Sequence, residues 1–171
     1  MKKKIIIGLL LSCALTVQAV EKESAIYVDK NWRVCFTPPY NKCTNFIIDE
    51  IAKARETVHI MAYGFTSSEI AKALIDAKSR GVSVHVLLDK SNLVGKTSQM
   101  QAIRAAGIDT AIYRVSAIAH NKIIIIDSNK VITGSFNFTN SANTKNAENV
   151  IVIEDKALAE RYLLNFHSFK E

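Results

Sequence analysis

The sequence predicts a layered α/β domain, in which helices pack around a central sheet, and three observations support this fold class. Short apolar runs rich in Val and Ile, typical of buried strands, recur along the chain. Between them lie segments whose apolar residues recur at helical spacing. Beyond an N-terminal stretch of different composition, the chain has the length of one domain. Strands that alternate with helices in this way indicate an α/β architecture.

The N-terminal stretch has the composition of a secretory signal peptide. Lys2 to Lys4 form a basic start, Ile5 to Val17 is mostly apolar, and small residues at Val17 and Ala19 suit a cleavage site. The apolar run is too short to cross a bilayer comfortably. We therefore predict a signal peptide over residues 1–19 and a single domain over residues 20–171, without stable membrane insertion after cleavage.

An alternative for the N-terminus is a lipoprotein signal, because Leu10-Leu11-Ser12-Cys13 loosely resembles a lipobox. Either processing event removes basic residues. The whole chain has 22 basic and 16 acidic residues, and loss of the three N-terminal lysines lowers its net charge from +6 to +3. A modest positive charge is compatible with a polyanionic substrate but does not establish one.

Cys35 and Cys43 remain in the mature chain, and they flank a proline-containing, turn-rich loop. In an exported protein this spacing predicts one disulfide that closes the loop. Two unpaired thiols are the alternative. We do not predict a metal site here, because no further Cys or His lies at ligand spacing.

The first half of the domain alternates strand and helix signals. Val34–Phe36 reads as a strand, Asn45–Thr57 as a helix and Val58–Phe65 as a second strand. Thr66-Ser67-Ser68-Glu69 has the pattern of a capping box, with a hydroxyl first and a carboxylate three residues later. The helix that it opens is expected to end at Gly81 in a left-handed cap.

The second half continues the same alternation and ends in a helix. Gly107 marks the end of its first helix, and Ser128-Asn129 marks a turn between two strands. The predicted elements are, in order, a strand Val82–Leu88, a helix Ser98–Ala106, strands Thr110–Tyr113, Lys122–Asp127, Val131–Thr133 and Asn149–Ile153, and a helix Lys156–Phe169.

The residues that carry chemistry lie in the run HNKIIIIDSNKVITGS, residues 120–135. His120 and Lys122 are separated by one residue, so on a strand their side chains project from the same face. Ile123–Ile126 is entirely β-branched and apolar, as expected for a buried strand. A neutral imidazole beside an ammonium group is suited to attack on a phosphate ester.

This run resembles the H-x-K-x(4)-D-x(6)-G-S motif of the phospholipase D superfamily, and every fixed position matches. Two further stretches, Gly134-Ser135-Phe136-Asn137 and Asn146-Ala147-Glu148-Asn149, are similar to those of the short bacterial endonucleases of the Nuc type. The resemblance covers the mature chain. It implies an α/β/α sandwich with a central mixed sheet and a single catalytic domain.

Phosphodiester cleavage needs a nucleophile, a positive charge for the phosphoryl oxygens and a proton for the leaving oxygen. His120 is the candidate nucleophile. Lys122 and Asn137 are expected to bind the non-bridging oxygens. Gly134 is expected to let the backbone approach the phosphate. Ser135 is a supporting candidate; it lacks the G-x-S-x-G setting of a serine hydrolase.

The resemblance assigns the remaining roles. It implies a phosphohistidine intermediate on His120, and it implies that Glu148 orients the imidazole. Asp127 belongs to the catalytic motif, but the resemblance gives it a mainly structural role, and a turn-holding or ion-pairing role is favoured over that of a base. No metal or other cofactor is expected, because lysine and asparagine side chains supply the charge stabilisation.

The chain holds one copy of the motif, whereas the family mechanism uses two histidines. A two-fold homodimer would bring His120, Lys122 and Asn137 of both subunits to one shared cleft. One histidine must be neutral while the other is protonated, so the pair should titrate as a coupled unit.

Other residues have simpler interpretations. His59 and His85 lie in apolar strand patterns and are expected to be partly buried, hydrogen-bonded sheet residues, while His167 is expected at the surface. Gly95-Lys96-Thr97 lacks the upstream glycine of a phosphate loop and is interpreted as a flexible loop. Several cations could flank the cleft and contact a nucleic-acid backbone, namely Lys42, Lys90, Lys96, Arg114 and Lys145.

The sequence therefore predicts an exported, metal-independent phosphodiesterase, periplasmic or secreted. Of the possible substrates it favours DNA or RNA, cleaved without sequence preference, because no base-reading motif is present. Two alternatives remain open. One is a hydrolase of a lipid phosphodiester such as cardiolipin, and the other is a nucleic-acid-binding envelope protein without turnover.

Overall fold

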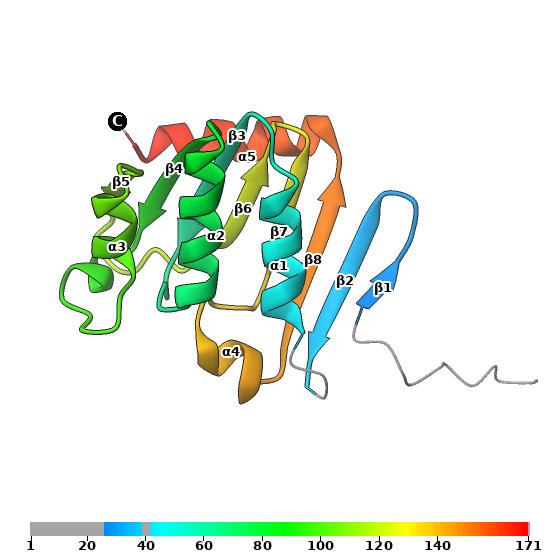
Figure 1. Ribbon diagram of the computed structural model, residues 1–171, viewed down its shortest axis with the longest axis horizontal. Helices are drawn as coiled ribbons and strands as arrows, with labels where there is room; N and C mark the ends of the chain where they lie inside the picture. Colours follow the sequence, from blue (N-terminus) through cyan, green and yellow to red (C-terminus); the bar gives the residue numbers. More distant parts are fainter. Residues whose placement is uncertain (1–25, 39–41, 171) are drawn as a thin grey trace, which may run out of the picture.

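A computed structural model describes residues 26–38 and 42–170. The predicted signal peptide and the lipobox alternative lie outside these residues. The described chain forms one eight-stranded sheet in the order β1-β2-β8-β7-β6-β3-β4-β5 (Figure 1). Strands β3, β4 and β5 are parallel to one another, and the other neighbouring pairs are antiparallel. The predicted mixed sheet is thus confirmed.

The strands follow the apolar runs of the sequence, with boundaries moved by one to three residues. They are β1 Ile26–Val28, β2 Trp32–Thr37, β3 Thr57–Ala62, β4 Ser83–Leu88, β5 Asp109–Ile112, β6 Lys122–Ile126, β7 Lys130–Gly134 and β8 Glu148–Glu154. Only β1 was not predicted, because three residues are too few to show a strand period.

Helices cover both faces of the sheet. The helices α1 Cys43–Ala52, α2 Ser68–Ser79 and α3 Met100–Ala105 lie on one face, and α5 Lys156–Ser168 crosses behind β3, β6 and β7 (Figure 1). The short α4 Asn140–Thr144 and a 3₁₀ turn, η1 Lys90–Leu93, were not predicted. Each face has its own apolar core, so the predicted α/β/α sandwich is confirmed.

Local signals explain how α2 begins and ends. The capping residue is Ser67 rather than the predicted Thr66: its hydroxyl accepts the Ile70 amide at 3.2 Å, while Glu69 accepts from Ser67 at 2.9 Å. The hydroxyl run allowed either choice; the backbone N–H groups of Thr66 and Ser67 both donate to the Phe138 carbonyl oxygen, and the helix begins after them at Ser68. Gly81 has φ +91° at the C-terminal end, as predicted, and spares the strain of a Cβ there.

A disulfide joins Cys35 of β2 to Cys43 at the start of α1, as predicted. The pairing fixes the first turn of α1 to the sheet. Both cysteines are fully buried in the core below α1. The side chain of residue 42 makes no capping hydrogen bond, but Asn143 Oδ1 of α4 accepts the backbone N–H of Thr44 in the first turn at 3.1 Å.

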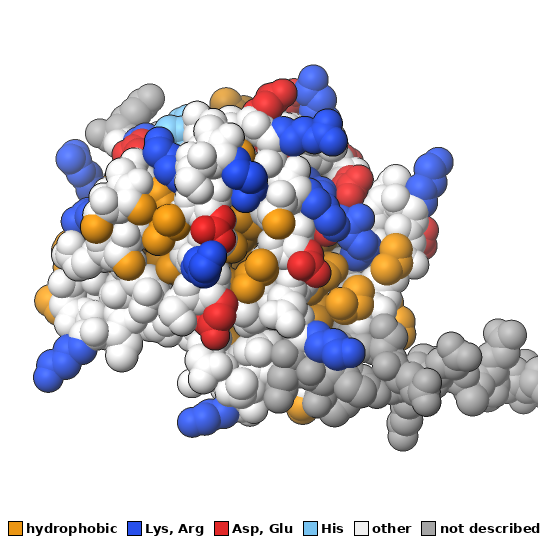
Figure 2. All heavy atoms as spheres, in the orientation of Figure 1, with side chains coloured by type: hydrophobic (Ala, Val, Ile, Leu, Met, Phe, Trp, Pro, Cys, Tyr) orange, Lys and Arg blue, Asp and Glu red, His pale blue; other side chains and the backbone are white. Residues whose placement is uncertain are grey.

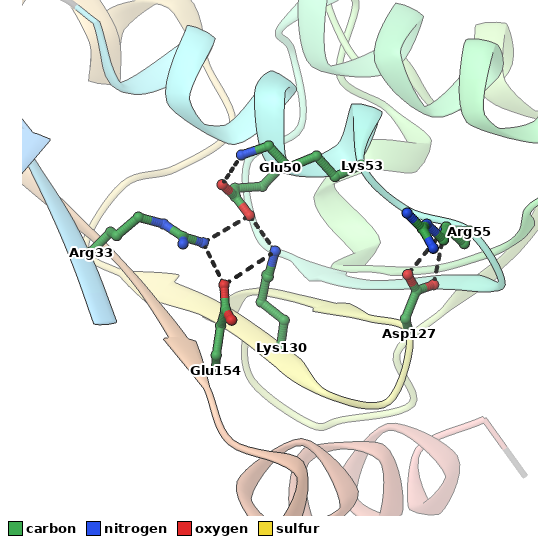
Figure 3. Close-up of polar contacts among 7 residues, drawn as sticks. All are labelled: Arg33, Glu50, Lys53, Arg55, Asp127, Lys130 and Glu154. Atoms are coloured by element: carbon green, nitrogen blue, oxygen red, sulfur yellow. Dashed lines mark hydrogen bonds and ion pairs between the residues drawn. The ribbon is translucent and has the colours of Figure 1, made fainter. Parts of the chain in front are cut away.

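A buried carboxylate ties α1 to the sheet a second time. Glu50 is 1% exposed, and its oxygens meet Arg33 of β2 at 3.0 Å, Lys53 at 2.8 Å and Lys130 of β7 (Figure 3). Burial alone would raise the pKa of Glu50, but the three cations outweigh it and lower the pKa. Removing any one cation leaves the others to hold a charge that burial disfavours.

Histidines gather on the opposite face, beneath the end of α5. His59 of β3 is buried; its ring stacks on His85 of β4 at 4.9 Å and meets the edge of Phe166 at 5.0 Å. His85 bonds Asp109 at 2.9 Å, and His167 is exposed, both as expected. The expected hydrogen bond is missing at His59 Nδ1, which is buried without a partner because apolar and aromatic groups surround it.

Burial of His59 predicts an acid-sensitive fold. Burial, helped by the nearby His85, His167 and Lys170, lowers the pKa of His59 from 6.5 to about 4. Because the unfolded chain binds this proton more tightly, stability should fall as the pH drops from about 6.5 to about 4. Denaturant unfolding of wild type and His59→Phe should show wild type losing about 3 kcal/mol relative to the variant across this window. Parallel pH profiles would contradict the prediction.

Candidate active site

Most of the predicted site residues meet at one edge of the sheet. Strand β3 ends at this edge and the antiparallel β6 begins there, so Ala62 pairs with Lys122. Strand β7 ends at the same edge and β8 begins there, with Gly134 opposite Val150. The chain thus brings residues 120–122, 134–137 and 148 together from three separate strand ends. We refer to this edge, the lower one in Figure 1, as the catalytic edge.

His120 and Lys122 are in direct contact. Lys122 Nζ lies 3.1 Å from His120 Nδ1 and donates to the His120 carbonyl oxygen at 2.9 Å. The ring of Tyr63, at the end of β3, lies 4.7 Å from the imidazole and 5.4 Å from Lys122 Nζ. His120 itself is exposed, so one side of the imidazole faces solvent while Tyr63 and Lys122 border the other.

Lys122 carries a buried charge with no carboxylate bound to it. Its residue is 8% exposed, and no ion pair between the described residues includes it. Burial lowers the pKa of Lys122, and the negative charge of Glu148 partly opposes this shift. Binding of an anion stabilises such a buried, unpaired ammonium group more than it stabilises one that is already paired with a carboxylate.

The sequence did not point to two residues that support His120, namely Asp89 and Tyr63. Tyr63 packs against the imidazole, and Asp89 holds the segment before it. Asp89, directly after β4, is 1% exposed; its carboxylate accepts the backbone N–H of Ala119 at 2.8 Å and of Ser91 at 2.9 Å. Burial would raise the pKa of Asp89, but these hydrogen bonds lower it. A polar residue at the end of a buried strand was the available signal for Asp89. Tyr63 gave no signal beyond its place at a strand end.

The carboxylate of Glu148 binds groups other than His120, and the orienting role expected of it stays a prediction. Its carboxylate accepts from the hydroxyl of Ser135 and from Asn146 Nδ2 at 2.8 Å. Among the described residues no hydrogen bond joins Glu148 to the imidazole. Ser135 Oγ in turn accepts the backbone N–H of Asn149 at 3.1 Å. In this state Glu148 orders the loop ends of β7 and β8 and acts on Lys122 through its charge.

The pairing of β7 with β8 requires a glycine at position 134. Its φ is +149°, and an added Cβ would lie 2.2 Å from the Asn149 carbonyl oxygen of β8. The sheet therefore requires a glycine here on its own account, and the expectation that Gly134 lets the backbone approach a phosphate stays a prediction. Its freedom lets β7 and β8 stay paired up to the point where Ser135 turns toward Glu148.

Asn137 packs against the strand end that carries Tyr63. A Cβ on Gly64 would lie 3.4 Å from Asn137 Oδ1, and Phe138 pairs with Phe65 just beyond. Asn137 Oδ1 is buried without a hydrogen-bond partner. Most buried polar atoms in proteins have a hydrogen-bond partner. At the catalytic edge, no described protein group holds the amide oxygen of Asn137.

Asp127 lies away from these groups. It follows the opposite end of β6, about 16 Å along the strand from Lys122. Its carboxylate accepts the backbone N–H groups of Arg55, Glu56 and Thr57 at 2.8–3.2 Å, and Figure 3 shows it facing Arg55. The structure therefore does not bring Asp127 to the catalytic edge; it holds the turn that leads into β3.

The flanking cations proposed from the sequence are exposed and belong to segments at the catalytic edge. Lys90 and Lys96 follow β4, Arg114 follows β5 and Lys145 follows α4. Lys42 precedes α1 at the same edge. In Figure 2 the charged side chains that project from the lower margin are Lys or Arg. Lys90 Nζ also bonds the Ser116 carbonyl oxygen at 3.1 Å, which joins two of the loops.

Two features are absent from residues 26–38 and 42–170, the part of the chain that the structure describes. No group of three or more His, Cys, Asp or Glu side chains is placed to hold a metal ion in this part of the chain. No helix within it has the length and apolar character needed to cross a bilayer.

Comparisons with known proteins agree on one family. A family model described as "Cardiolipin synthase, PLD-like domain" matches residues 47–170. A protein named phospholipase D from Rickettsia prowazekii is 56% identical over 140 residues, which cover 82% of this chain and 68% of that protein. A mitochondrial cardiolipin hydrolase from Danio rerio is 32% identical over 136 residues, covering 77% of this chain and 60% of that protein.

A solved structure matches as well. The phospholipase D family member Nuc from Salmonella typhimurium aligns with a TM-score of 0.76 and 36% sequence identity. The alignment covers 81% of this chain and 92% of that one. The two chains therefore share their fold over nearly the whole of the Nuc domain.

The position of Asp127 predicts that stability and activity can be separated. Asp127→Asn keeps a residue that tolerates φ +51° but weakens the bonds to three backbone amides. We expect a loss of about 1–3 kcal/mol in the free energy of unfolding. Turnover of a soluble phosphodiester below the melting temperature should be unchanged. Lys122→Met is the matched contrast: it should abolish turnover and leave stability equal or higher.

Proposed function

This chain belongs to the phospholipase D superfamily, and we propose that it is an exported endonuclease that hydrolyses DNA or RNA without a metal ion. The observation that carries the chemistry is the contact between His120 and the buried ammonium of Lys122. It places a nucleophile beside an unpaired positive charge at an open edge. The basic start and the apolar run of residues 1–19 support export to the periplasm or beyond.

The contact also defines the first step. An ammonium donates to Nδ1, so in this state the proton of a neutral imidazole lies on Nε2. That tautomer presents an N–H at Nε2 and not a lone pair, so Nε2 cannot attack phosphorus in this state. For Nε2 to attack phosphorus, Lys122 must leave Nδ1 for the phosphate oxygens, and Nδ1 must take the proton. A bound phosphate therefore draws Lys122 away and frees His120 to act as a nucleophile.

The full reaction needs two imidazoles, which a homodimer would supply. His120 of one subunit attacks phosphorus and forms a P–N bond as the P–O bond to the leaving group breaks. His120 of the second subunit, which starts as the protonated imidazolium, gives a proton to the departing oxygen and becomes neutral. Water then attacks the phosphohistidine and loses a proton to that second imidazole, which restores both groups. Each catalytic cycle thus consumes one water molecule per bond cleaved.

A nucleic-acid substrate is favoured by the form of the catalytic edge. His120 is exposed, and the segments around it carry Lys90, Lys96, Arg114 and Lys145. A long phosphate backbone can contact several such cations at once, with little dependence on base sequence. The likeness to Nuc over 92% of that chain supports the same reading.

A lipid phosphodiester is the second candidate, and the names of the relatives favour it. Proteins of 56% and 32% identity are named phospholipase D and cardiolipin hydrolase. The catalytic step would be unchanged, because the phosphodiester group is common to both substrates. The two candidates differ in what lies around that group.

The nuclease proposal predicts chelator-resistant cleavage that depends on His120. Wild-type protein in excess EDTA should nick plasmid DNA and cut RNA. His120→Ala should lower the rate by at least about 10³-fold, because it removes the nucleophile. His167→Ala is the matched control, since His167 is an exposed histidine on α5. Turnover of cardiolipin vesicles with no cleavage of either nucleic acid would support the lipid candidate instead.

A composite site predicts how mixed subunits behave. When equal amounts of wild type and His120→Ala exchange subunits, only about a quarter of the dimers keep two imidazoles. The specific activity should fall to about a quarter of that of wild type. Mixing wild type with His167→Ala should leave it unchanged, and native mass measurements report the exchange. A fall to only one half would show that each subunit works alone.

A further inference from the structure

Exposed aliphatic side chains stand beside the catalytic edge and have no role in the chemistry above. Val94 is 84% exposed, Ile118 57% and Leu93 54%. They lie on two loops, residues 90–97 and 114–119, which we call the docking rim. Away from this rim, the exposed large apolar residues of the described chain are Leu164 on α5 and four residues of the β1–β2 hairpin.

The docking rim is fixed to the site. Asn92 donates to the Tyr63 carbonyl oxygen at 2.7 Å, and Tyr63 packs against the imidazole. Lys90 joins the first loop to the second through Ser116, and Asp89 holds Ala119, the residue before His120. The exposed tips and the nucleophile therefore belong to one hydrogen-bonded unit. A surface that contacts the tips also lies close to His120.

The charges of the docking rim indicate what it contacts. The two loops contain Lys90, Lys96 and Arg114 and no acidic residue. Aliphatic tips flanked by cations suit an anionic bilayer, in which the apolar side chains enter the acyl region and the cations meet the head groups. A single nucleic-acid strand would instead be expected to stack its bases on aromatic side chains, and the rim residues 90–97 and 114–119 include none.

We propose that the docking rim seats the catalytic edge on the surface of an anionic phospholipid bilayer. Leu93, Val94 and Ile118 enter the interface, while Lys90, Lys96 and Arg114 bind head-group phosphates. His120 then lies at the depth of the phosphodiester groups. This inference rests on the proposed phosphodiesterase chemistry only for the role of His120, because docking itself can be measured without turnover.

A single tryptophan tests the contact directly. The chain has one tryptophan, Trp32, so Val94→Trp in a Trp32→Phe background reports the environment of the rim alone. Vesicles of phosphatidylglycerol and phosphatidylcholine should shift its emission to the blue, and lipids brominated in the acyl chains should quench it. Leu164→Trp in the same background is the control, since Leu164 is 63% exposed on α5, and it should not respond. No response at position 94, or equal responses at both positions, would overturn the proposal.

A second variant separates lipid from nucleic acid. Leu93→Ser/Val94→Ser, prepared with the same N-terminus as wild type, should bind these vesicles about tenfold more weakly. Plasmid nicking and hydrolysis of soluble bis(4-nitrophenyl) phosphate should be unchanged, because neither residue touches His120 or Lys122. Unchanged vesicle binding together with weakened plasmid binding would overturn the proposal and assign the rim to nucleic acid. Failure to hydrolyse the soluble ester in wild type would count against the proposed function alone.

Discussion

The site depends on one constraint of the sheet. Strand β6 lies between β3 and β7 and runs antiparallel to both, so that β6 begins where they end. Its register places Lys122 opposite Ala62 and next to the end of β7. Because β6 begins where its neighbours end, groups far apart in the sequence meet at one edge. Tyr63 arrives from β3 and the Ser135–Glu148 pair from β7 and β8. A shift of β6 by one residue would turn Lys122 to the other face and dissolve the arrangement.

The buried ammonium links this geometry to the chemistry. Lys122 is nearly inaccessible and lacks a bound carboxylate, so its burial opposes its charge and lowers its pKa. The fold tolerates the unfavourable free energy of burying this charge because β6 is hydrogen-bonded to β3 on one side and to β7 on the other. In the proposed mechanism, a phosphate that reaches the edge pairs with Lys122 and removes the hydrogen bond that holds the His120 proton on Nε2. Substrate binding and activation of the nucleophile would then occur together.

Several groups that hold the fold together lie away from the catalytic edge. The Glu50 network joins α1 to the far ends of β2 and β7, and Asp127 holds the turn before β3. The acid-sensitive His59 lies under α5 on the other face. This separation lets the loops of the catalytic edge vary in what they contact, which is where a nuclease and a lipid hydrolase of one family would differ.

The sequence by itself determined the features that depend on near neighbours. Alternation and apolar runs predicted seven of the eight strands, and the spacing of His120 and Lys122 predicted that the two lie side by side, although His120 itself precedes β6. The disulfide followed from a short loop. Only the tertiary structure decided which strand ends meet, since no local pattern encodes strand order or register. That order places Tyr63 and Asp89 beside the segment that carries His120. It also pairs Glu148 with Ser135 and packs Gly134 against Asn149. At the other end of the sheet, it lets Asp127 bind backbone amides some 70 residues earlier in the chain.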